Sequence, residues 1–412
     1  MTIDFAIFSC FYFVFGTIII EWFRIANKSR RYSFQFLSLA LLFRMLLTYY
    51  YYYFSLSNAA DSRGYFDYAS AHHFELAGLL SPGLTFINNL TVIILNTVSF
   101  FSNPYLMLFI PYSFIGFIGS LLFFKIIEPY FSDKNRIKWA YLLAFFLPNM
   151  VFWTSNIGKD SIIYFGIILI VYGLLMETAP KTKIFMIVAG SIIVYFIRPH
   201  IFLFLIVGFL FGLFSARRAF TVRSLFIFLA FFVTFLLLYQ KVFEFVGIST
   251  EENENVIDHG INFYYHTGVM TLERNSKNLD YGGAAAGGSH KFNILYSPLY
   301  LVQFLGGPFL WQSRKPIQFF SALENLLYQF MIFYVLMHLK VFLKDSKLQF
   351  KIGWVSYIVL ASVTMGMAYS NYGLAIREKC MVLPFVIIIF TSVYSQRLLK
   401  SKIISKNKPR MV

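Results

Sequence analysis

The feature that most constrains this chain is its division into apolar blocks of roughly 15 to 25 residues, separated by short connections that carry the charges. A membrane-spanning helix needs about 20 mostly apolar residues, because every backbone N–H and C=O group in lipid must be bonded internally. Of the 412 residues, 58% are apolar and only 13% are charged, too few to cover a soluble globule of that size. The sequence therefore predicts an all-α, polytopic integral membrane protein.

We predict eleven transmembrane helices in a single transmembrane domain over residues 1–412. They cover residues 5–23, 33–55, 104–126, 138–156, 161–176, 184–197, 201–215, 224–245, 317–338, 352–369 and 380–396. The apolar block 184–214 would be about 46 Å long as one helix, against a hydrocarbon core of about 30 Å. We therefore expect Arg198-Pro199-His200 to divide it into two helices.

Two other apolar stretches are not predicted to span the membrane. Residues 83–101 mix Asn and Thr with Leu, Ile and Phe, a composition that favours an interfacial helix on the outer face. Residues 294–311 contain Pro298 and the Gly306-Gly307-Pro308 turn, so we expect a re-entrant or interfacial segment. This segment belongs to a long outer loop, predicted over residues 247–316.

The distribution of basic residues predicts the orientation. Of the 35 Lys and Arg residues, 23 fall in alternate connections and in the basic tail, residues 397–412. Because basic loops stay in the cytoplasm, the N-terminus is expected outside and the tail inside, in a bacterial-type inner (plasma) membrane. The first helix follows Asp4 rather than a basic segment and is interpreted as a retained helix.

Several classes of function are disfavoured. The net charge of +16 lies between the spans rather than on a soluble face, so no nucleic-acid partner is expected. Cys10 and Cys380 alone form neither a disulfide framework nor a cysteine metal site. The adjacent His72 and His73 lack a third ligand at a suitable spacing, so the sequence implies no cofactor firmly and does not support a divalent metal.

Polar residues of the remaining turns are predicted to meet on the outer face. Charges near membrane depth are expensive and usually functional. The candidates are Asp61, Arg63, Tyr65 and Asp67 in the first outer loop, Lys159 and Asp160 in the second, Arg198 and His200 in the third, and Arg377 and Lys379 in the last.

Each candidate also has a structural interpretation. Asp61 is suited to capping an interfacial helix, and Lys159-Asp160 to a salt-bridged helix start. Arg198 is suited to an interfacial position from which its charge reaches water. The joint placement of these residues is what the structural interpretations leave unexplained.

One carboxylate among several cations beside a bilayer suits sugar transfer from a polyprenyl phosphate or diphosphate. The cations, for which we expect Lys159, Arg198 and Arg377, neutralise the leaving phosphate, and Arg offers bidentate contacts. The carboxylate, for which we expect Asp61, takes the proton of the attacking hydroxyl. Asp67 and Asp160 are the rival bases.

Short segments resemble known families. The segment "DSRGYFDYA", followed by an interfacial helix, is similar to the first outer loop of the GT-C glycosyltransferases, which use lipid-linked donors and carry their catalytic acid in that loop. The order of a helix with Arg44 and then an Asp and Tyr pair resembles EpsG and Wzy-like polysaccharide polymerases, and "NYGLAIREKCMVLP" is similar to outer turns in both groups. The chain departs from the GT-C pattern by reaching its acidic loop after the second helix rather than the first.

These observations predict a membrane glycosyltransferase of cell-envelope polysaccharide or glycolipid assembly. Its partners would be the bilayer, a polyprenyl-linked sugar donor and a glycan or lipid acceptor. Two alternatives stay open at this point: a Wzy/EpsG-like polymerase, and a transporter or flippase of a lipid-linked anionic glycan. A transporter would more often show internal repeats, which the sequence lacks.

Overall fold

The structure, a computed structural model, is all-α in the part of the chain that it describes. These residues are 2–27, 33–58, 60–131, 136–216, 297–313, 316–344, 350–368 and 372–406. Every regular element among them is a helix, which confirms the all-α part of the predicted fold class. The predicted helix 224–245 and most of the predicted loop 247–316 lie outside the described residues.

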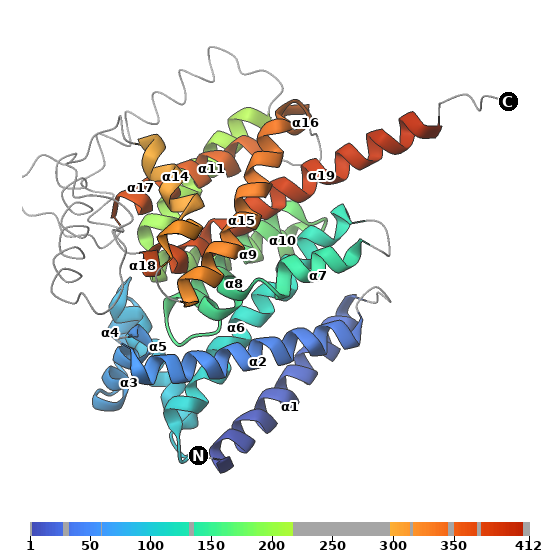
Figure 1. The fold of residues 1–412 in the computed structure, drawn as a ribbon. Helices are drawn as coiled ribbons and strands as arrows, with labels where there is room; N and C mark the ends of the chain where they lie inside the picture. Colours follow the sequence, from blue (N-terminus) through green and yellow to red (C-terminus); the bar gives the residue numbers. More distant parts are fainter. Residues whose placement is uncertain are drawn as a thin grey trace, which may run out of the picture. The chain divides into compact units, whose positions relative to one another are not determined.

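The chain divides into two compact units, whose helices are labelled in Figure 1. Unit 1 comprises Met1–Ile126 and Lys138–Phe202, and unit 2 comprises Ile127–Ile137 and Leu203–Val412. The single domain predicted over residues 1–412 stays a prediction.

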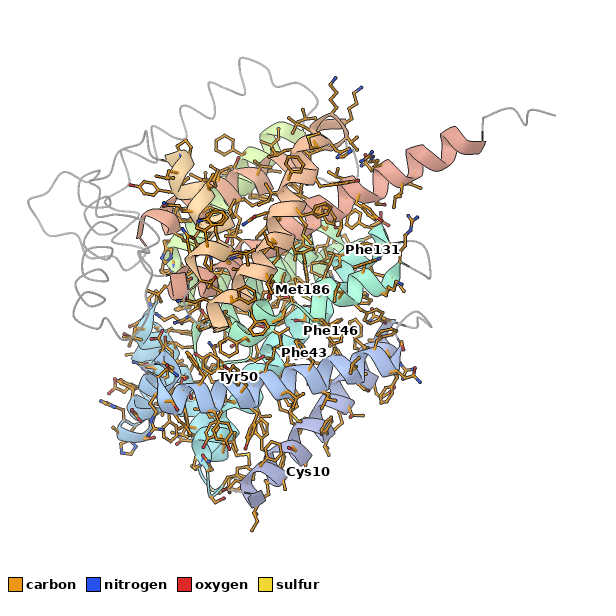
Figure 2. All side chains as sticks on the ribbon, viewed as in Figure 1. Cys10, Phe43, Tyr50, Phe131, Phe146 and Met186 are labelled. Atoms are coloured by element: carbon orange, nitrogen blue, oxygen red, sulfur yellow. The ribbon has the colours of Figure 1, made fainter. Side chains whose placement is uncertain are left out.

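Unit 1 is built from ten helices and the start of an eleventh, counted over the described residues. They are α1 (Thr2–Asn27), α2 (Phe34–Ser57), α3 (Asp61–Ala71), α4 (Leu76–Leu79), α5 (Leu84–Val98), α6 (Pro104–Ile127), α7 (Ile137–Phe145), α8 (Pro148–Trp153), α9 (Lys159–Leu175), α10 (Pro180–Ile197) and the start of α11 (Pro199–Ala216). α2 packs against α1, α3 and α8, and α10 packs against α9 and α5. Aromatic side chains of α2 pack against the α7–α8 region. The Phe43 and Phe146 ring centroids are 5.5 Å apart, and those of Tyr50 and Phe152 are 5.9 Å apart. Figure 2 labels Phe43, Tyr50 and Phe146.

Unit 2 contains part of the segment predicted to be re-entrant or interfacial, and the last long helices. Its described elements are η1 (Glu128–Tyr130), the rest of α11 from Leu203 on, α14 (Ser297–Gly306), η4 (Leu310–Gln312), α15 (Pro316–Met337), α16 (Leu339–Lys344), α17 (Lys351–Ala368), α18 (Tyr372–Glu378), η5 (Lys379–Met381) and α19 (Leu383–Lys406). α14 packs against α15 and α17, and α19 packs against α15, α16 and η1. α19 remains helical to Lys406, so the first part of the predicted basic tail continues that helix.

Four described helices are long and apolar enough to cross a membrane: Ile3–Asn27, Pro104–Tyr130, Pro180–Ile197 and Gln318–Met337. Four shorter apolar helices lie at Leu84–Val98, Pro199–Leu213, Lys351–Gly366 and Leu383–Leu399. Large apolar side chains of α1 are exposed, among them Ile18, Trp22 and Ile25. Such a surface fits a lipid environment better than water.

Proline explains where two apolar stretches break. The block 184–214 divides at Arg198, as predicted, because Pro199 lacks the N–H that a continuous helix needs. The prediction of one helix over 138–156 is wrong, since α7 ends at Phe145 and α8 begins at Pro148. Proline is well tolerated at the first helical position but interrupts a helix interior, so Pro148 starts a new helix.

Candidate functional site

The start of α9 forms the centre of the candidate site. Gly158 precedes the helix with a backbone φ of 134°, a conformation that glycine adopts readily. A Cβ atom at Gly158 would lie 2.6 Å from the Tyr65 ring, so glycine also lets α3 approach this turn. Predicted site residue Tyr65 is therefore buried against the residue that precedes Lys159 and Asp160.

Asp160 and Arg198 form a buried ion pair in unit 1. Asp160 is fully buried, and its Oδ1 lies 3.6 Å from Nη2 of Arg198, which is 8% exposed. Asn156, one turn earlier, donates from Nδ2 to Asp160 Oδ2 over 3.3 Å. Burial makes this pair different from a surface ion pair, because removing either partner leaves a charge away from water.

Lys159 and His200 complete the cluster. Both Arg198 and Lys159 lie within electrostatic reach of His200, at the loop end of α11. Burial, and then these two cations, lower the pKa of His200 to about 3, so its imidazole is neutral near pH 7. The four predicted residues Lys159, Asp160, Arg198 and His200 therefore come together, with two cations and one anion.

The position of Arg198 is fixed by the end of α10. The Arg198 N–H donates to Val194 O over 2.8 Å, which closes the helix. Two residues before Arg198, Phe196 O accepts from Gly83 N over 2.7 Å, and the Phe86 and Phe196 rings lie 5.2 Å apart. The start of α5 thus holds the α10–α11 turn in place.

Asp61 is the first residue of α3 and is exposed. The N-cap position belongs to Ala60, so Asp61 lies inside the helix start rather than at its cap. Residues four apart share one helix face, so Asp61 lies one turn from Tyr65, which packs on Gly158. The fold therefore places Asp61 one helical turn from the side chain that contacts the start of α9.

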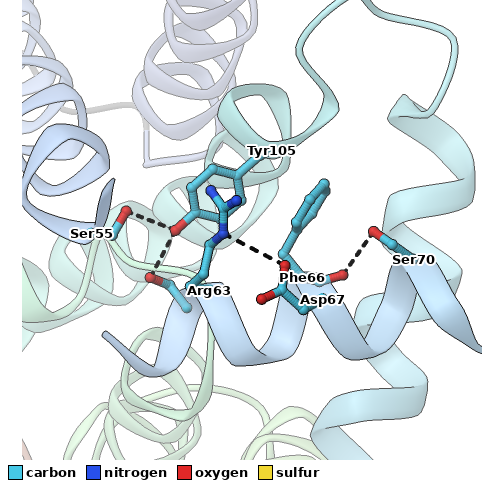
Figure 3. Close-up of polar contacts among 7 residues, drawn as sticks. Ser55, Arg63, Phe66, Asp67, Ser70 and Tyr105 are labelled. Atoms are coloured by element: carbon cyan, nitrogen blue, oxygen red, sulfur yellow. Dashed lines mark hydrogen bonds and ion pairs between the residues drawn. The ribbon is translucent and has the colours of Figure 1, made fainter. Parts of the chain in front are cut away.

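Arg63 and Asp67 lie elsewhere on α3 and contact each other (Figure 3). Arg63 Nε is 3.5 Å from Asp67 Oδ1, and the guanidinium lies over the Tyr105 ring, 5.3 Å from its centroid. The Tyr105 hydroxyl donates to Ser55 Oγ over 2.7 Å and lies 3.1 Å from Ser62 Oγ. Both Arg63 and Asp67 are exposed, so in this structure they form a surface ion pair on α3 next to Tyr105.

Arg377 and Lys379 lie in unit 2 and are both buried. The Lys379 ammonium group donates to Asn325 Oδ1 over 3.0 Å and to Gly307 O, and Asn325 Nδ2 donates to Gly307 O over 2.8 Å. Burial lowers the pKa of Lys379 to about 7, against the opposite effect of Glu324. Lys379 thus holds the Gly306-Gly307-Pro308 turn of the predicted re-entrant segment.

Sequence reasoning missed two amides that the structure places at these clusters. Asn156 contacts Asp160, and the signal that points to it is an amide four residues before that carboxylate, in the connection between α8 and α9. Asn325 lies in an apolar helix, where a polar side chain is itself a signal of a buried partner. Neither signal identifies the partner of the amide, which only the structure shows.

Other parts of unit 1 offer less chemistry. An apolar cavity of about 400 Å³ is lined by Phe11, Phe15 and eight further residues, of which Thr97 alone has a polar side chain. No group of three or more His, Cys, Asp or Glu side chains that could hold a metal ion occurs among the described residues. Within unit 1, the cluster at the start of α9 is therefore the strongest candidate for a site that binds a charged substrate.

This cluster can bind an anion through Arg198 and Lys159 and can accept a proton or a hydroxyl hydrogen bond through a carboxylate. The N-terminus of α9 adds backbone N–H groups and a positive helix-dipole end to the same place. Comparison with models of protein families, with curated proteins and with solved structures finds no match for this chain.

Proposed function

We propose that the protein is a membrane glycosyltransferase that transfers a sugar from a polyprenyl phosphate or diphosphate to a glycan or lipid acceptor. The observation that carries the proposal is the cluster of the buried Asp160 and Arg198 with the half-buried Lys159 and His200, in a chain whose helices suit a bilayer. Lys159 and Arg198 supply positive charge of the kind that binds a phosphate group. Charged side chains in an apolar, membrane-spanning chain are usually functional.

The proposed reaction needs one base and one anion site. The acceptor hydroxyl oxygen attacks the anomeric carbon, and the bond from that carbon to the phosphate oxygen breaks. The hydroxyl proton passes to the Asp61 carboxylate, and the phosphate leaves with the bonding electron pair as an anion. Arg198 and Lys159 stabilise the charge that develops on it, and Arg377 stays a predicted third cation.

We also propose the finer topology that the charge pattern predicts. The protein would cross a bacterial-type inner membrane eleven times, with the N-terminus outside and the basic tail inside. The start of α9 and the α10–α11 turn would then face outward, where a donor carried to the outer leaflet arrives.

A reporter fusion tests this orientation. A fusion after Arg223 should report a cytoplasmic position, and one after Gly287 an external position, because basic connections remain inside. Paired phosphatase and fluorescent reporters at each site give opposite signals and check one another. Both fusions on one side of the membrane would refute the topology.

Donor binding tests the anion site. Lys159→Gln should weaken the binding of a polyprenyl phosphate sugar, and the loss should be larger at low than at high ionic strength because the missing interaction is electrostatic. Lys181→Gln is the matched control, since Lys181 is an exposed cation at the opposite end of α10 from Arg198. Binding is measured by titration of purified protein in lipid nanodiscs. Equal affinities in the wild type and Lys159→Gln at both salt concentrations would count against the site.

Two alternatives are separated by the products. A polymerase would use a lipid-linked glycan as acceptor and yield a ladder of longer chains, whereas a transferase adds one sugar. A transporter or flippase would bind the same donor without breaking the bond to phosphate. Arg44, a charged residue inside α2, is the observation that favours transport, since such residues often line transport paths.

A further inference from the structure

Arg44 is a buried cation in the middle of an apolar helix. It is 2% exposed, and it makes no ion pair with any residue that the structure describes. Its guanidinium bonds only to uncharged oxygens: Ser113 O at 3.0 Å, Ser120 Oγ at 3.3 Å, and Thr154 O and Oγ1 both at 2.9 Å. A charge at membrane depth is costly even on lenient scales, so these contacts have to offset a sizeable penalty.

Two of the four contacts fall on one residue, Thr154. Thr154 follows the last residue of α8, and the next helix begins only at Lys159. In a continuous helix the Thr154 carbonyl would accept from the N–H four residues later, but here it accepts from Arg44. The Thr154 hydroxyl donates to Met150 O over 2.7 Å and so can accept from Arg44 at the same time.

The packing around this contact is close. A Cβ atom at Gly116 would lie 2.0 Å from Thr154 O and 2.6 Å from Arg44 Nη1. No larger residue fits without moving the carbonyl or the guanidinium. α2, α6 and the end of α8 therefore meet at one point, which we name the Arg44 clamp: Arg44, Ser113, Gly116, Ser120 and Thr154.

The clamped residue leads directly into the candidate site. Ser155 Oγ donates to Val151 O over 2.6 Å, and Ser161 Oγ donates to Asn156 O over 3.4 Å. Gly158 then lies against Tyr65, and Asp160 meets Arg198. Only five residues separate the end of α8 from the start of α9. We therefore expect a shift of Thr154 to move the Lys159 and Asp160 side chains.

We propose that Arg44 is a positioning residue: by holding the broken helix end at Thr154, it sets the geometry of Lys159 and Asp160 against Arg198. Arg44 need not touch substrate in this role. The activity test below rests on the proposed function, whereas the labelling test does not.

Thiol labelling tests the clamp without any substrate. In a background of Cys10→Ser and Cys380→Ala, Ser155→Cys places a thiol at a fully buried position beside Thr154, and Ser62→Cys places one at a fully buried position on α3. Adding Arg44→Gln should raise the labelling rate of Ser155→Cys by about tenfold or more and leave that of Ser62→Cys nearly unchanged. An equal rise at both positions would show general loosening of the fold and would overturn the proposal, as would no rise at either.

A second variant guards against misfolding. Thr154→Val removes the hydroxyl acceptor but keeps the carbonyl, the charge and the approximate volume, and it should raise labelling at Ser155→Cys in the same direction by a smaller factor. If Arg44→Gln does not insert into the membrane, the proposal is tested by Thr154→Val instead. An unchanged labelling rate of Ser155→Cys in the Thr154→Val protein would then overturn the proposal.

Transfer kinetics test the consequence for the site. Arg44→Lys keeps the charge but loses the planar guanidinium group that donates two hydrogen bonds to Thr154. We therefore expect kcat to fall by about 10- to 100-fold in correctly folded protein. Combined with Lys159→Gln, the loss should be smaller than the product of the two single losses, because both changes disturb one unit. Combined with Lys181→Gln, the losses should multiply. Simple multiplication in both pairs would overturn the proposal, whereas a wild-type protein without transfer activity would refute only the proposed function.

Discussion

Replacing Asp61 by Asn should lower the rate of sugar transfer by about 100- to 10,000-fold, the usual contribution of a general base. Asn has nearly the same shape but cannot take the proton of the attacking hydroxyl. Because Asp61 is exposed at the first residue of α3, the change should leave folding and membrane insertion intact. The measurement is product formation by purified protein in proteoliposomes, normalised to the folded protein recovered by gel filtration.

The control and the rival bases make this result decisive. Glu177→Gln neutralises an exposed acid of unit 1 outside the candidate site and should leave the rate near that of the wild type. If Asp61→Asn keeps full activity and Asp67→Asn or Asp160→Asn loses it, the base is the other residue. Full transfer activity in all three variants would rule out Asp61, Asp67 and Asp160 as the base, whereas a wild-type protein that binds donor but forms no product would favour transport.

Breaking the ion pair of Asp160 and Arg198 should have the largest effect on stability. Removing one partner of a buried pair leaves an uncompensated charge and typically costs about 3–5 kcal/mol. Asp160→Asn and Arg198→Met alone should each lower the temperature at which the detergent-solubilised protein aggregates. The double variant should recover much of that loss, because no buried charge is then left without its partner.

Recovery of stability without recovery of donor binding is the specific outcome expected for a functional site. Heating followed by fluorescence-detected gel filtration measures the first, and titration with a polyprenyl phosphate sugar measures the second. The matched control is the exposed pair of Arg63 and Asp67, whose side chains are 49% and 62% exposed. The pair Arg63→Gln and Asp67→Asn should change stability little, since exposed ion pairs contribute about 0–1 kcal/mol. A double variant of Asp160 and Arg198 that binds donor normally would assign the buried pair to folding alone.

Much of the local structure follows from the sequence, because in lipid the backbone N–H and C=O groups can be hydrogen-bonded in few ways. Apolar blocks become helices, the Arg198-Pro199 step divides the 184–214 block, and the polar-apolar mixture of residues 83–101 forms the helix α5. The break at Pro148 obeys the same rule and was open to prediction from the missing N–H of proline. The number of spans and their orientation stay predictions from charge.

Which side chains meet is the part that only the tertiary structure decided. A helix that is apolar on all sides carries no stripe to tell its protein-facing side from its lipid-facing side, so sequence periodicity does not specify how it is rotated. The approach of Asp160 to Arg198 depends on how α9 and α10 pack, and the grip of Arg44 on Thr154 depends on a glycine of a third helix. The sequence alone determined that charged residues had to be placed in an apolar chain; packing between helices far apart in the sequence determined their partners.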